Sequence, residues 1–274
     1  MTNKIKFAFF GSSKFSVFCL EELKKLDHLP TVIVTTADKP QGRKMEIIKS
    51  EVKIWAENNQ IEYLTTDQIE NFDCELYLVA SYGKIISKKV LDTPKFGVLN
   101  IHPSLLPKYR GSSPLQTQIL NDEKKVGVTI MQIDEQIDHG PIVAQKELEI
   151  KDWPVKFEAL EKITAEEGVK LFAQVLPDWI DGKIEPTTQN HSAATFTKKI
   201  EKSDGLIDIV NGNPYQNFLK IQAYSLWPQA YFFIGETRVI IKDAEFKDGV
   251  LNIKRVLPAG KKEMTYEDFQ RGLK

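Results

Sequence analysis

The chain has 274 residues, of which 42% are hydrophobic and 27% are charged. This length and composition predict a globular protein with one large domain or two unequal domains and a sizeable buried core. The formal net charge of −1 excludes binding of a polyanion through global charge, so any nucleic-acid contact would need local basic patches.

The cysteines and the hydropathy pattern indicate the cellular setting. Cys19 and Cys74 are too few and too far apart to predict a disulfide framework or a thiolate metal site. No apolar run approaches the roughly 20 residues that a membrane helix needs, and the apolar run at residues 7–10 is too short for a signal peptide. We therefore expect a cytoplasmic protein with no membrane partner.

The first 180 or so residues alternate between predicted strands and predicted helices. Apolar or β-branched runs predict strands at residues 5–10, 31–36, 75–80, 98–102 and 126–133. Helical spacing predicts helices over residues 15–26 and 157–176, a third with Ile48, Val52, Trp55 and Ala56 on one face, and a fourth over 114–120 with proline in its first turn. This alternation predicts an α/β domain with an open, mostly parallel, Rossmann-like sheet.

The composition changes near residue 188. Residues 189–194 are small and polar, and we expect a linker over 189–206. Short strand-like runs follow at 230–234, 238–241 and 250–253, separated by turn signals at Gly235 and at Asp248-Gly249. We therefore predict one domain over 1–188 and a small β-barrel-like domain of reduced OB type over 207–274.

Several common site motifs are missing from the sequence. Only Gly11 follows the first predicted strand, where a dinucleotide-binding fold would carry Gly-x-Gly-x-x-Gly. Neither a P-loop nor a Gly-x-Ser-x-Gly nucleophile motif occurs. The four histidines (His28, His102, His139 and His191) lack the spacing of metal ligands, so we expect no bound metal.

Residues 100–111 carry the most informative pattern, with the sequence NIHPSLLPKYRG. In a strand, Asn100 and His102 lie two residues apart and project from the same face. They also lie at the carboxyl end of that strand, where open α/β sheets bind ligands. In acyl transfer an amide can stabilise an oxyanion and an imidazole can move a proton. Taken alone, a histidine before a proline is more often an ordinary turn residue.

A second polar stretch, MQIDEQIDHGP at residues 131–141, follows the strand predicted at 126–133. Asp138 in this stretch could orient His102, as a carboxylate beside an imidazole does. The alternative is that residues 138–141 form only a turn. Spacing alone leaves both interpretations open.

Together the two stretches resemble the 10-formyltetrahydrofolate-dependent formyltransferases. The shared pattern is Asn-x-His-Pro-Ser-Leu-Leu-Pro-x-Tyr-Arg-Gly, followed downstream by Met-x-x-x-Glu-x-x-Asp-x-Gly-Pro. This resemblance implies that residues 1–188 form the catalytic domain and that Asn100, His102 and Asp138 are its catalytic residues. It also implies that the formyl donor, 10-formyltetrahydrofolate, lies near a further set of residues: Ser104, Leu105, Leu106, Pro107, Tyr82, Gly83 and Gly11.

Features outside these motifs indicate the formyl acceptor. The segment Asp-Lys-Pro-Gln-Gly-Arg at 38–43 looks like the basic loop that enters the tRNA acceptor stem in the methionyl-tRNA branch of this family, which implies tRNA contacts by Lys39, Arg43 and Lys44. Segments 194–205, 227–230 and 257–272 resemble the linker and C-terminal domain of that branch. The resemblance implies initiator methionyl-tRNA as the partner, a role in translation initiation, and tRNA contact by residues 207–274.

Alternatives to this acceptor remain open at the level of the sequence. The same chemistry could act on an amino sugar nucleotide, with the C-terminal domain as a dimerisation or accessory module. A non-catalytic RNA-binding protein with a relict site is a further alternative, and the basic loop could be a solvated turn. Residues 189–274 hold 13 Lys or Arg against 10 Asp or Glu, a small positive excess that fits tRNA contact without requiring it. We expect a monomer.

The chain departs from the family pattern in three places. Lys49-Ser50-Glu51 stands where Pro-Ser-Pro is usual, which predicts a less rigid segment after the basic loop. Gln136 stands where glycine is usual and His139 where a small residue is usual, so the backbone beside Asp138 is expected to differ locally. The C-terminal domain is shorter than usual, so we expect one or more strands of its barrel to be missing.

Overall fold

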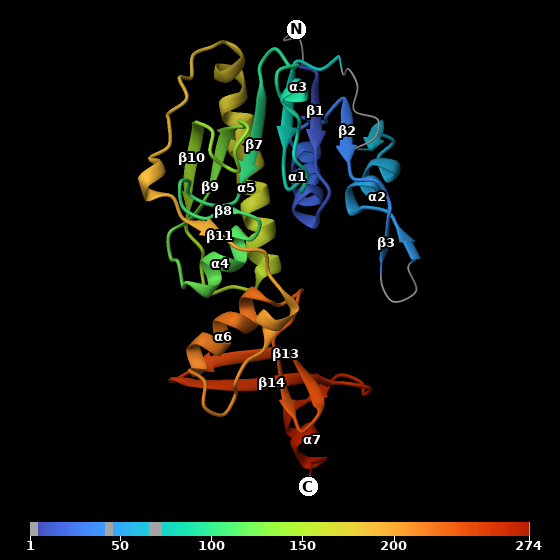
Figure 1. Ribbon diagram of the computed structural model, residues 1–274, viewed down its shortest axis with the longest axis vertical. Coiled ribbons are helices and arrows are strands. Elements are labelled where there is room, and N and C mark those ends of the chain that lie inside the picture. Colours follow the sequence, from blue (N-terminus) through green and yellow to red (C-terminus); the bar gives the residue numbers. More distant parts are fainter. Residues whose placement is uncertain (1–4, 42–45, 66–72, 274) are drawn as a thin grey trace. The chain divides into compact units, whose positions relative to one another are not determined.

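A computed structural model describes residues 5–41, 46–65 and 73–273 of the chain (Figure 1). The chain divides into two compact units. Unit 1 comprises residues 1–111, 127–148 and 161–196, and unit 2 comprises residues 112–126, 149–160 and 197–274. The domain boundaries given above, at 188 and 206, remain a prediction.

Unit 1 is built on a seven-stranded sheet with the strand order β10–β9–β7–β6–β1–β2–β5. Its strands are β1 (Phe7–Phe10), β2 (Val32–Thr35), β5 (Tyr63–Thr65), β6 (Leu76–Val79), β7 (Val98–His102), β9 (Val126–Gln132) and β10 (Ile142–Leu148). Strands β5, β2, β1, β6 and β7 pair in parallel, whereas β9 runs antiparallel to β7. The predicted mostly parallel α/β sheet is confirmed.

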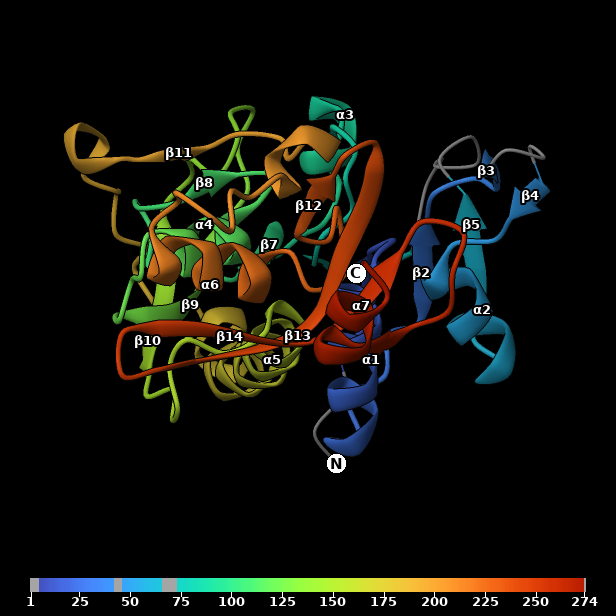
Figure 2. The same cartoon turned by 90° about the horizontal axis from the view of Figure 1, so that it is seen from below.

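Helices cover both faces of this sheet. They are α1 (Lys14–Lys25), α2 (Glu51–Asn58), α3 (Lys88–Leu91) and α5 (Phe157–Ile180). Helices α1 and α5 lie on one face and α3 lies on the other (Figure 2). Strand β1 is buried at all four positions because Phe7 packs on Phe172 of α5 while Phe10 packs on Tyr77 on the opposite face. None of the described helices has the length and apolar character needed to cross a membrane.

Short elements complete unit 1 and the connection that follows it. They are β3 (Lys39–Gln41), β4 (Glu46–Ile48), β8 (Arg110–Gly111), the 3₁₀ helix η2 (His191–Ala193) and β11 (Phe196–Thr197). Strands β3 and β4 pair antiparallel, so the segment expected to be a basic loop contains a short hairpin.

The structure corrects the expected position of Ile48. Ile48 was expected on the apolar face of a helix but lies in β4, and it is 45% exposed. The hydroxyl of Ser50 accepts the backbone N–H of Lys53 at 3.0 Å and so caps α2, which begins only at Glu51. Val52, Trp55 and Ala56 are buried as expected.

Helix α5 is longer than its sequence pattern indicates. The helix was expected over residues 157–176, and the next residue is Pro177, whose ring removes a helical hydrogen bond. Instead α5 continues to Ile180, and the indole Nε1 of Trp179 donates to the carbonyl oxygen of Phe96 at 2.9 Å. This tertiary hydrogen bond holds the last turn in place.

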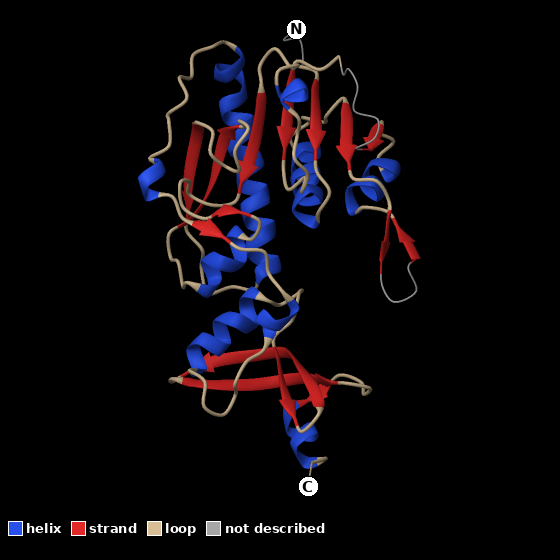
Figure 3. Ribbon diagram, viewed as in Figure 1, coloured by secondary structure: helices blue, strands red, loops and turns tan. Residues whose placement is uncertain are grey.

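Unit 2 contains a four-stranded antiparallel sheet, which confirms the expected small β region (Figure 3). Its elements are α4 (Pro114–Leu120), the 3₁₀ helix η3 (Lys202–Gly205), α6 (Pro214–Ala223), β12 (Tyr231–Ile234), β13 (Thr237–Lys247), β14 (Val250–Pro258), β15 (Met264–Thr265) and α7 (Tyr266–Arg271). Asp248 and Gly249 both have positive φ, as the turn of a tight β-hairpin requires.

Two apolar clusters stabilise unit 2. The first joins the sheet to α7 and includes Phe232, Val239 and Phe269. The second joins α4 to α6 through Leu115 and Tyr224. The second cluster therefore combines residues near position 115 with residues near position 224, a pairing that no local sequence pattern could predict.

Gly168 of α5 allows this helix to pack closely on β7. Replacing a helical glycine with alanine usually stabilises a protein, but at this position we expect the replacement to destabilise it. A Cβ at Gly168 would lie 2.4 Å from Cγ2 of Ile101. In an open helix site, Gly→Ala stabilises by about 1 kcal/mol. We expect Gly168→Ala to lower the free energy of unfolding by about 1–3 kcal/mol instead, because overpacking displaces β7. Denaturant unfolding measures the change.

The matched control is Gln174→Ala, at an exposed position of the same helix. This variant should unfold at the wild-type denaturant concentration or slightly above it. A stabilised Gly168→Ala protein would contradict the close packing of α5 on β7.

Candidate active site

Strand β7 presents Asn100 and His102 on the same face of the sheet. Ile101 between them points at Gly168 of α5, so its two neighbours point to the opposite face. Asn100 pairs in register with Val79 of β6 and with Met131 of β9. It is partly exposed, and its side-chain amide has no hydrogen-bond partner within the described part of the chain. This amide is therefore available to a ligand.

His102 is almost completely buried, with an exposed fraction of 4%. Its Nε2 lies 3.0 Å from the carbonyl oxygen of Tyr109. Because a carbonyl oxygen can only accept, Nε2 must carry a hydrogen. The other ring nitrogen, Nδ1, lies 3.6 Å from Oδ1 of Asp138. The ring thus lies between a backbone acceptor and a carboxylate.

Asp138 reaches His102 from the turn between β9 and β10. Its backbone has a φ of 48°, in the left-handed region. Its Oδ2 accepts the backbone N–H of Gly111 at 2.7 Å, while Oδ1 faces His102. The structure therefore brings together Gly111 and Asp138, which belong to different motifs and lie 27 residues apart in the sequence.

The loop formed by Ser104, Leu105, Leu106 and Pro107 follows β7 and is fixed by buried hydrogen bonds. The hydroxyl of Thr129, which is fully buried, donates to the carbonyl oxygen of Ser104 at 2.6 Å and accepts the N–H of Leu106 at 3.2 Å. Gln145 donates from Nε2 to both the Leu106 carbonyl oxygen and the Thr129 hydroxyl. The loop beside His102 is therefore tied to β9 and β10.

Gly11, Tyr82 and Gly83 lie at the carboxyl ends of β1 and β6, which are neighbours in the sheet. The hydroxyl of Ser12 donates to the Tyr82 carbonyl oxygen at 3.0 Å and so joins the two strand ends. The ring of Tyr82 is buried against Phe10. A Cβ on Gly11 would lie 2.6 Å from Cβ of Ser16, so glycine is needed here for packing. Since β6 also pairs with β7, these residues share an edge of the sheet with His102.

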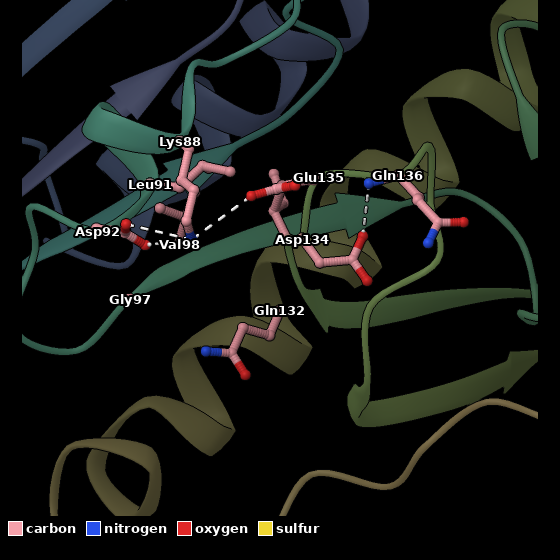
Figure 4. A pocket seen from close by; sticks show the side chains of 10 residues that line it. Lys88, Leu91, Asp92, Gly97, Val98, Gln132, Asp134, Glu135 and Gln136 are labelled. Atoms are coloured by element: carbon pink, nitrogen blue, oxygen red, sulfur yellow. Dashed lines mark hydrogen bonds and ion pairs between the residues drawn. The ribbon is translucent and has the colours of Figure 1, made fainter.

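A pocket of about 420 Å³ lies between α3, the start of β7 and the segment that leads to Asp138 (Figure 4). It is lined by ten residues: Lys88, Leu91, Asp92, Gly97, Val98, Gln132, Ile133, Asp134, Glu135 and Gln136. Lys88 reaches across it, with Nζ 3.5 Å from Glu135 and 3.3 Å from Asp92. The hydrogen bond to Asp92, with a further contribution from Glu135, raises the pKa of Lys88. The lining therefore combines the apolar side chains of Leu91, Val98 and Ile133 with charged side chains.

Gln136 and His139, the two residues near Asp138 that depart from the family pattern, lie in different environments. His139 stacks on His191 with ring centroids 4.0 Å apart and places Nδ1 2.6 Å from Oδ2 of Asp134. Gln136 lines the pocket, and its backbone N–H is bonded to Asp134. Among the described residues, no three His, Cys, Asp or Glu side chains are grouped so that they could hold a metal ion.

The basic residues of the 38–44 segment are described only in part. Arg43 and Lys44 lie outside the described residues, and of Lys39 only the backbone is described, within β3. At the base of the hairpin, Lys53 of α2 forms an ion pair with Asp38 at 2.7 Å.

Comparison with known proteins identifies the family to which this site belongs. Residues 4–176 match the formyl transferase family. A methionyl-tRNA formyltransferase of Thermotoga maritima is 32% identical over 301 aligned positions, which cover 98% of this chain and 95% of the relative. One of Methylacidiphilum infernorum is 34% identical, with the same coverage of both chains. The chain belongs to the methionyl-tRNA formyltransferase family. The predicted family is confirmed, and the protein is a formyl-group transferase.

Solved structures share the fold of this formyltransferase. The methionyl-tRNA formyltransferase of Clostridium thermocellum has a TM-score of 0.65 at 17% identity, covering 93% of this chain and 98% of that one. An N-formyltransferase of Helicobacter canadensis, solved with folinic acid and dTDP-3-aminofucose, has a TM-score of 0.63 at 22% identity, covering 89% of both chains. At these identities the similarity establishes the fold alone.

Sequence reasoning missed two parts of the candidate site. The pocket between α3 and the Asp138 turn draws its residues from several separate segments, so no motif marks it. Gln189, which was assigned to the linker, is buried and donates hydrogen bonds to the carbonyl oxygens of Asp138 and Gly140. A polar residue in a linker gives no signal of burial before the fold is known.

The hydroxyl of Thr129 gives a direct test of how the loop after β7 is held. We expect Thr129→Val, which has nearly the same shape, to lower the free energy of unfolding by about 1–3 kcal/mol, because it leaves buried polar partners unsatisfied. Thr129→Ser keeps the hydroxyl and should lose less than Thr129→Val. Equal losses in the two variants, measured by denaturant unfolding, would show that packing rather than the hydroxyl holds the loop.

Proposed function

We propose that this chain transfers the formyl group of 10-formyltetrahydrofolate to the α-amino group of initiator methionyl-tRNA, as a step in translation initiation. The observation that carries the proposal is the placement of Asn100, His102 and Asp138 at one edge of the sheet. It is supported by the 32% and 34% identity, over nearly the full chain, to relatives named methionyl-tRNA formyltransferase. The formyl transferase family and its folate-bound structural neighbours support a folate-derived formyl donor.

The proposed reaction uses groups whose positions are described above. The neutral α-amine attacks the formyl carbon, and the carbonyl electron pair moves to oxygen. The free amide of Asn100 donates to this oxyanion, and the buried His102 ring, faced by Asp138, stabilises the developing charge or takes part in proton transfer. The intermediate then collapses with cleavage of the bond to N10 of the folate. N10 gains a proton and the former amine loses one, so the reaction is balanced.

The pocket beside the Asp138 turn is the proposed site of the flat pterin ring. Its volume of about 420 Å³ fits a ring system of this size, and Leu91, Val98 and Ile133 offer apolar contact to the ring faces. Asp134 and Glu135 add carboxylates that can accept hydrogen bonds from ring N–H groups. The rest of the folate would extend towards Ser104, Leu105, Leu106 and Pro107, with Gly11, Tyr82 and Gly83 at the same edge of the sheet.

The proposed tRNA contacts involve the basic residues of the 38–44 segment and the C-terminal residues. Lys39, Arg43 and Lys44 supply cations that could meet backbone phosphates of the acceptor stem. Residues 207–274 form the proposed second tRNA-contacting region. The proposal also places the enzyme in the cytoplasm as a monomer, because all three proposed catalytic residues come from one chain.

An amino sugar nucleotide is the second candidate acceptor. Fold similarity does not separate the two candidates, since the TM-scores to the Clostridium thermocellum and Helicobacter canadensis structures are 0.65 and 0.63. Sequence favours the tRNA acceptor, because the relatives named methionyl-tRNA formyltransferase are 32% and 34% identical over nearly the full chain, against 22% for the structure solved with dTDP-3-aminofucose. One assay that supplies labelled 10-formyltetrahydrofolate with either charged initiator tRNA or an amino sugar nucleotide decides between them.

Removing either polar group of the site should abolish most of the turnover in this assay. We expect Asn100→Ala and Asp138→Ala each to lower kcat by about 10²–10³, the usual cost of losing one group that stabilises an oxyanion. Asp181→Ala, which removes an exposed acid at the end of α5, should keep the wild-type kcat. Near-normal turnover in a folded Asn100→Ala or Asp138→Ala protein would refute the assignment.

A larger side chain in the pocket should weaken the binding of the folate and leave the binding of the tRNA unchanged. We expect Leu91→Trp to raise the KM for 10-formyltetrahydrofolate about tenfold or more, because the indole occupies space proposed for the pterin ring. The KM for methionyl-tRNA should stay unchanged. Leu91→Met, a volume-conserving control, should change neither value appreciably. An equal rise in both KM values would count against the pocket as the folate site.

A further inference from the structure

The turn that carries Asp138 is tied to Gln189, a residue far along the chain. The Gln189 side chain is 4% exposed, and its Nε2 donates to the carbonyl oxygens of Asp138 at 3.0 Å and Gly140 at 2.7 Å. Asp138 has a φ of 48°, which residues other than glycine rarely adopt. A turn in this conformation persists when its surroundings over-determine it, and the two hydrogen bonds from Gln189 do so here.

The other end of the Gln189 amide holds Arg110. Its Oε1 accepts from Nη2 of Arg110 at 2.6 Å and from Nε at 3.2 Å, and Arg110 is 3% exposed. The next residue, Gly111, donates its backbone N–H to the Asp138 carboxylate at 2.7 Å. Gln189 therefore links the backbone of Asp138 to the segment that holds the Asp138 side chain.

His191, one member of a stacked histidine pair, is a second acceptor for the Arg110 guanidinium. Nη2 of Arg110 lies 2.9 Å from Nδ1 of His191, and this nitrogen must accept because a guanidinium can only donate. The ring of His191 lies parallel to that of His139, at 4.0 Å. Burial, with further contributions from His139 and Arg110, lowers the pKa of His191. His191 therefore stays a neutral acceptor at neutral pH.

We infer that Gln189 and Arg110 are positioning residues for formyl transfer, which hold the Asp138 turn so that its carboxylate faces Nδ1 of His102. The inference rests on the proposed function for the reaction that it serves. The role needs a side chain that donates to two carbonyl oxygens and accepts from a guanidinium at once. An amide meets this need, whereas a carboxylate lacks the donor and a thioether lacks both strong groups.

Two substitutions of similar size test this requirement. Gln189→Glu keeps an acceptor for Arg110 but turns an oxygen towards the two carbonyl oxygens, and Gln189→Met removes both functions. We expect each to lower kcat by about 10- to 100-fold, since ångström-scale displacement of a catalytic group has effects of this size. The KM for 10-formyltetrahydrofolate should stay unchanged. Gln174→Ala on the exposed face of α5 is the control and should keep the wild-type kcat.

Coupling to Asp138 distinguishes positioning from a general structural role. In the Asp138→Ala background, Gln189→Met should have no further effect on kcat, because no carboxylate remains to be positioned. Single-turnover measurements make the low residual rates accessible. If the two losses multiply instead, Gln189 acts independently of Asp138 and the inference is overturned.

The ring ¹⁵N shifts of His102 provide a readout that needs no acceptor. At fixed pH they should move in the same direction in Gln189→Glu and Gln189→Met as in Asp138→Asn, and stay at wild-type values in Gln174→Ala. A His102→Gln spectrum assigns the signals, and Gln189→Met serves if the buried charge of Gln189→Glu prevents folding. Unchanged shifts in a folded Gln189 variant would overturn the inference. A wild-type enzyme that formylates no methionyl-tRNA would overturn the proposed acceptor and leave this shift test in force.

Discussion

The hydrogen bond from the Gly111 N–H to the Asp138 carboxylate, at 2.7 Å, is the constraint on which the site depends. The segment 100–111 leaves β7, turns, and returns so that His102 and Gly111 both face the same carboxylate. Along the way the carbonyl oxygen of Tyr109 accepts a hydrogen bond from the His102 ring. If the turn shifted, the ring would lose its backbone acceptor and the carboxylate its backbone donor together. The hydrogen bonds of Thr129 and Gln145 to this loop prevent such a shift.

The strands of the sheet were predictable to the extent that both of their faces are buried. Strands β1, β2 and β6 are buried at every position and appear in the sequence as continuous apolar runs. Strand β10 is fully buried only at Leu148 and carries charged residues, so its sequence contains no such run. Helix α6 did have a local signal that went unused, because Asn213 caps it and Pro214 occupies its first turn. The partners of α6, by contrast, come from residues near position 115 and from β13, and are set only by the fold.

The residues of the candidate site likewise fall into those that a local sequence pattern predicts and those that only the fold brings together. The two-residue spacing of Asn100 and His102 placed them on one face of a strand, because that periodicity is local. The sequence left two interpretations of Asp138 open, a contact with His102 or a simple turn, since the contact depends on how β9 pairs with β7. Gln189 could not be found at all before the fold was known. Its segment is held beside β10 by the pairing of Ile142 with Thr187, a contact across more than forty residues. Tertiary pairing thus decides which polar residues belong to the site.

The environment of His102 also limits the ways in which it can contribute to the proposed reaction. Its Nε2 hydrogen is committed to a backbone carbonyl, and its other nitrogen faces a carboxylate that is itself 16% exposed. With 4% of the residue exposed, the ring has little direct access to water for proton exchange. In the proposed reaction this environment favours electrostatic stabilisation over proton transfer as the role of His102, and such stabilisation costs no reorganisation at the moment of reaction. The Asp138 carboxylate is the charged group nearest to the second ring nitrogen, and the hydrogen bonds from Gly111 and Gln189 fix where that charge lies.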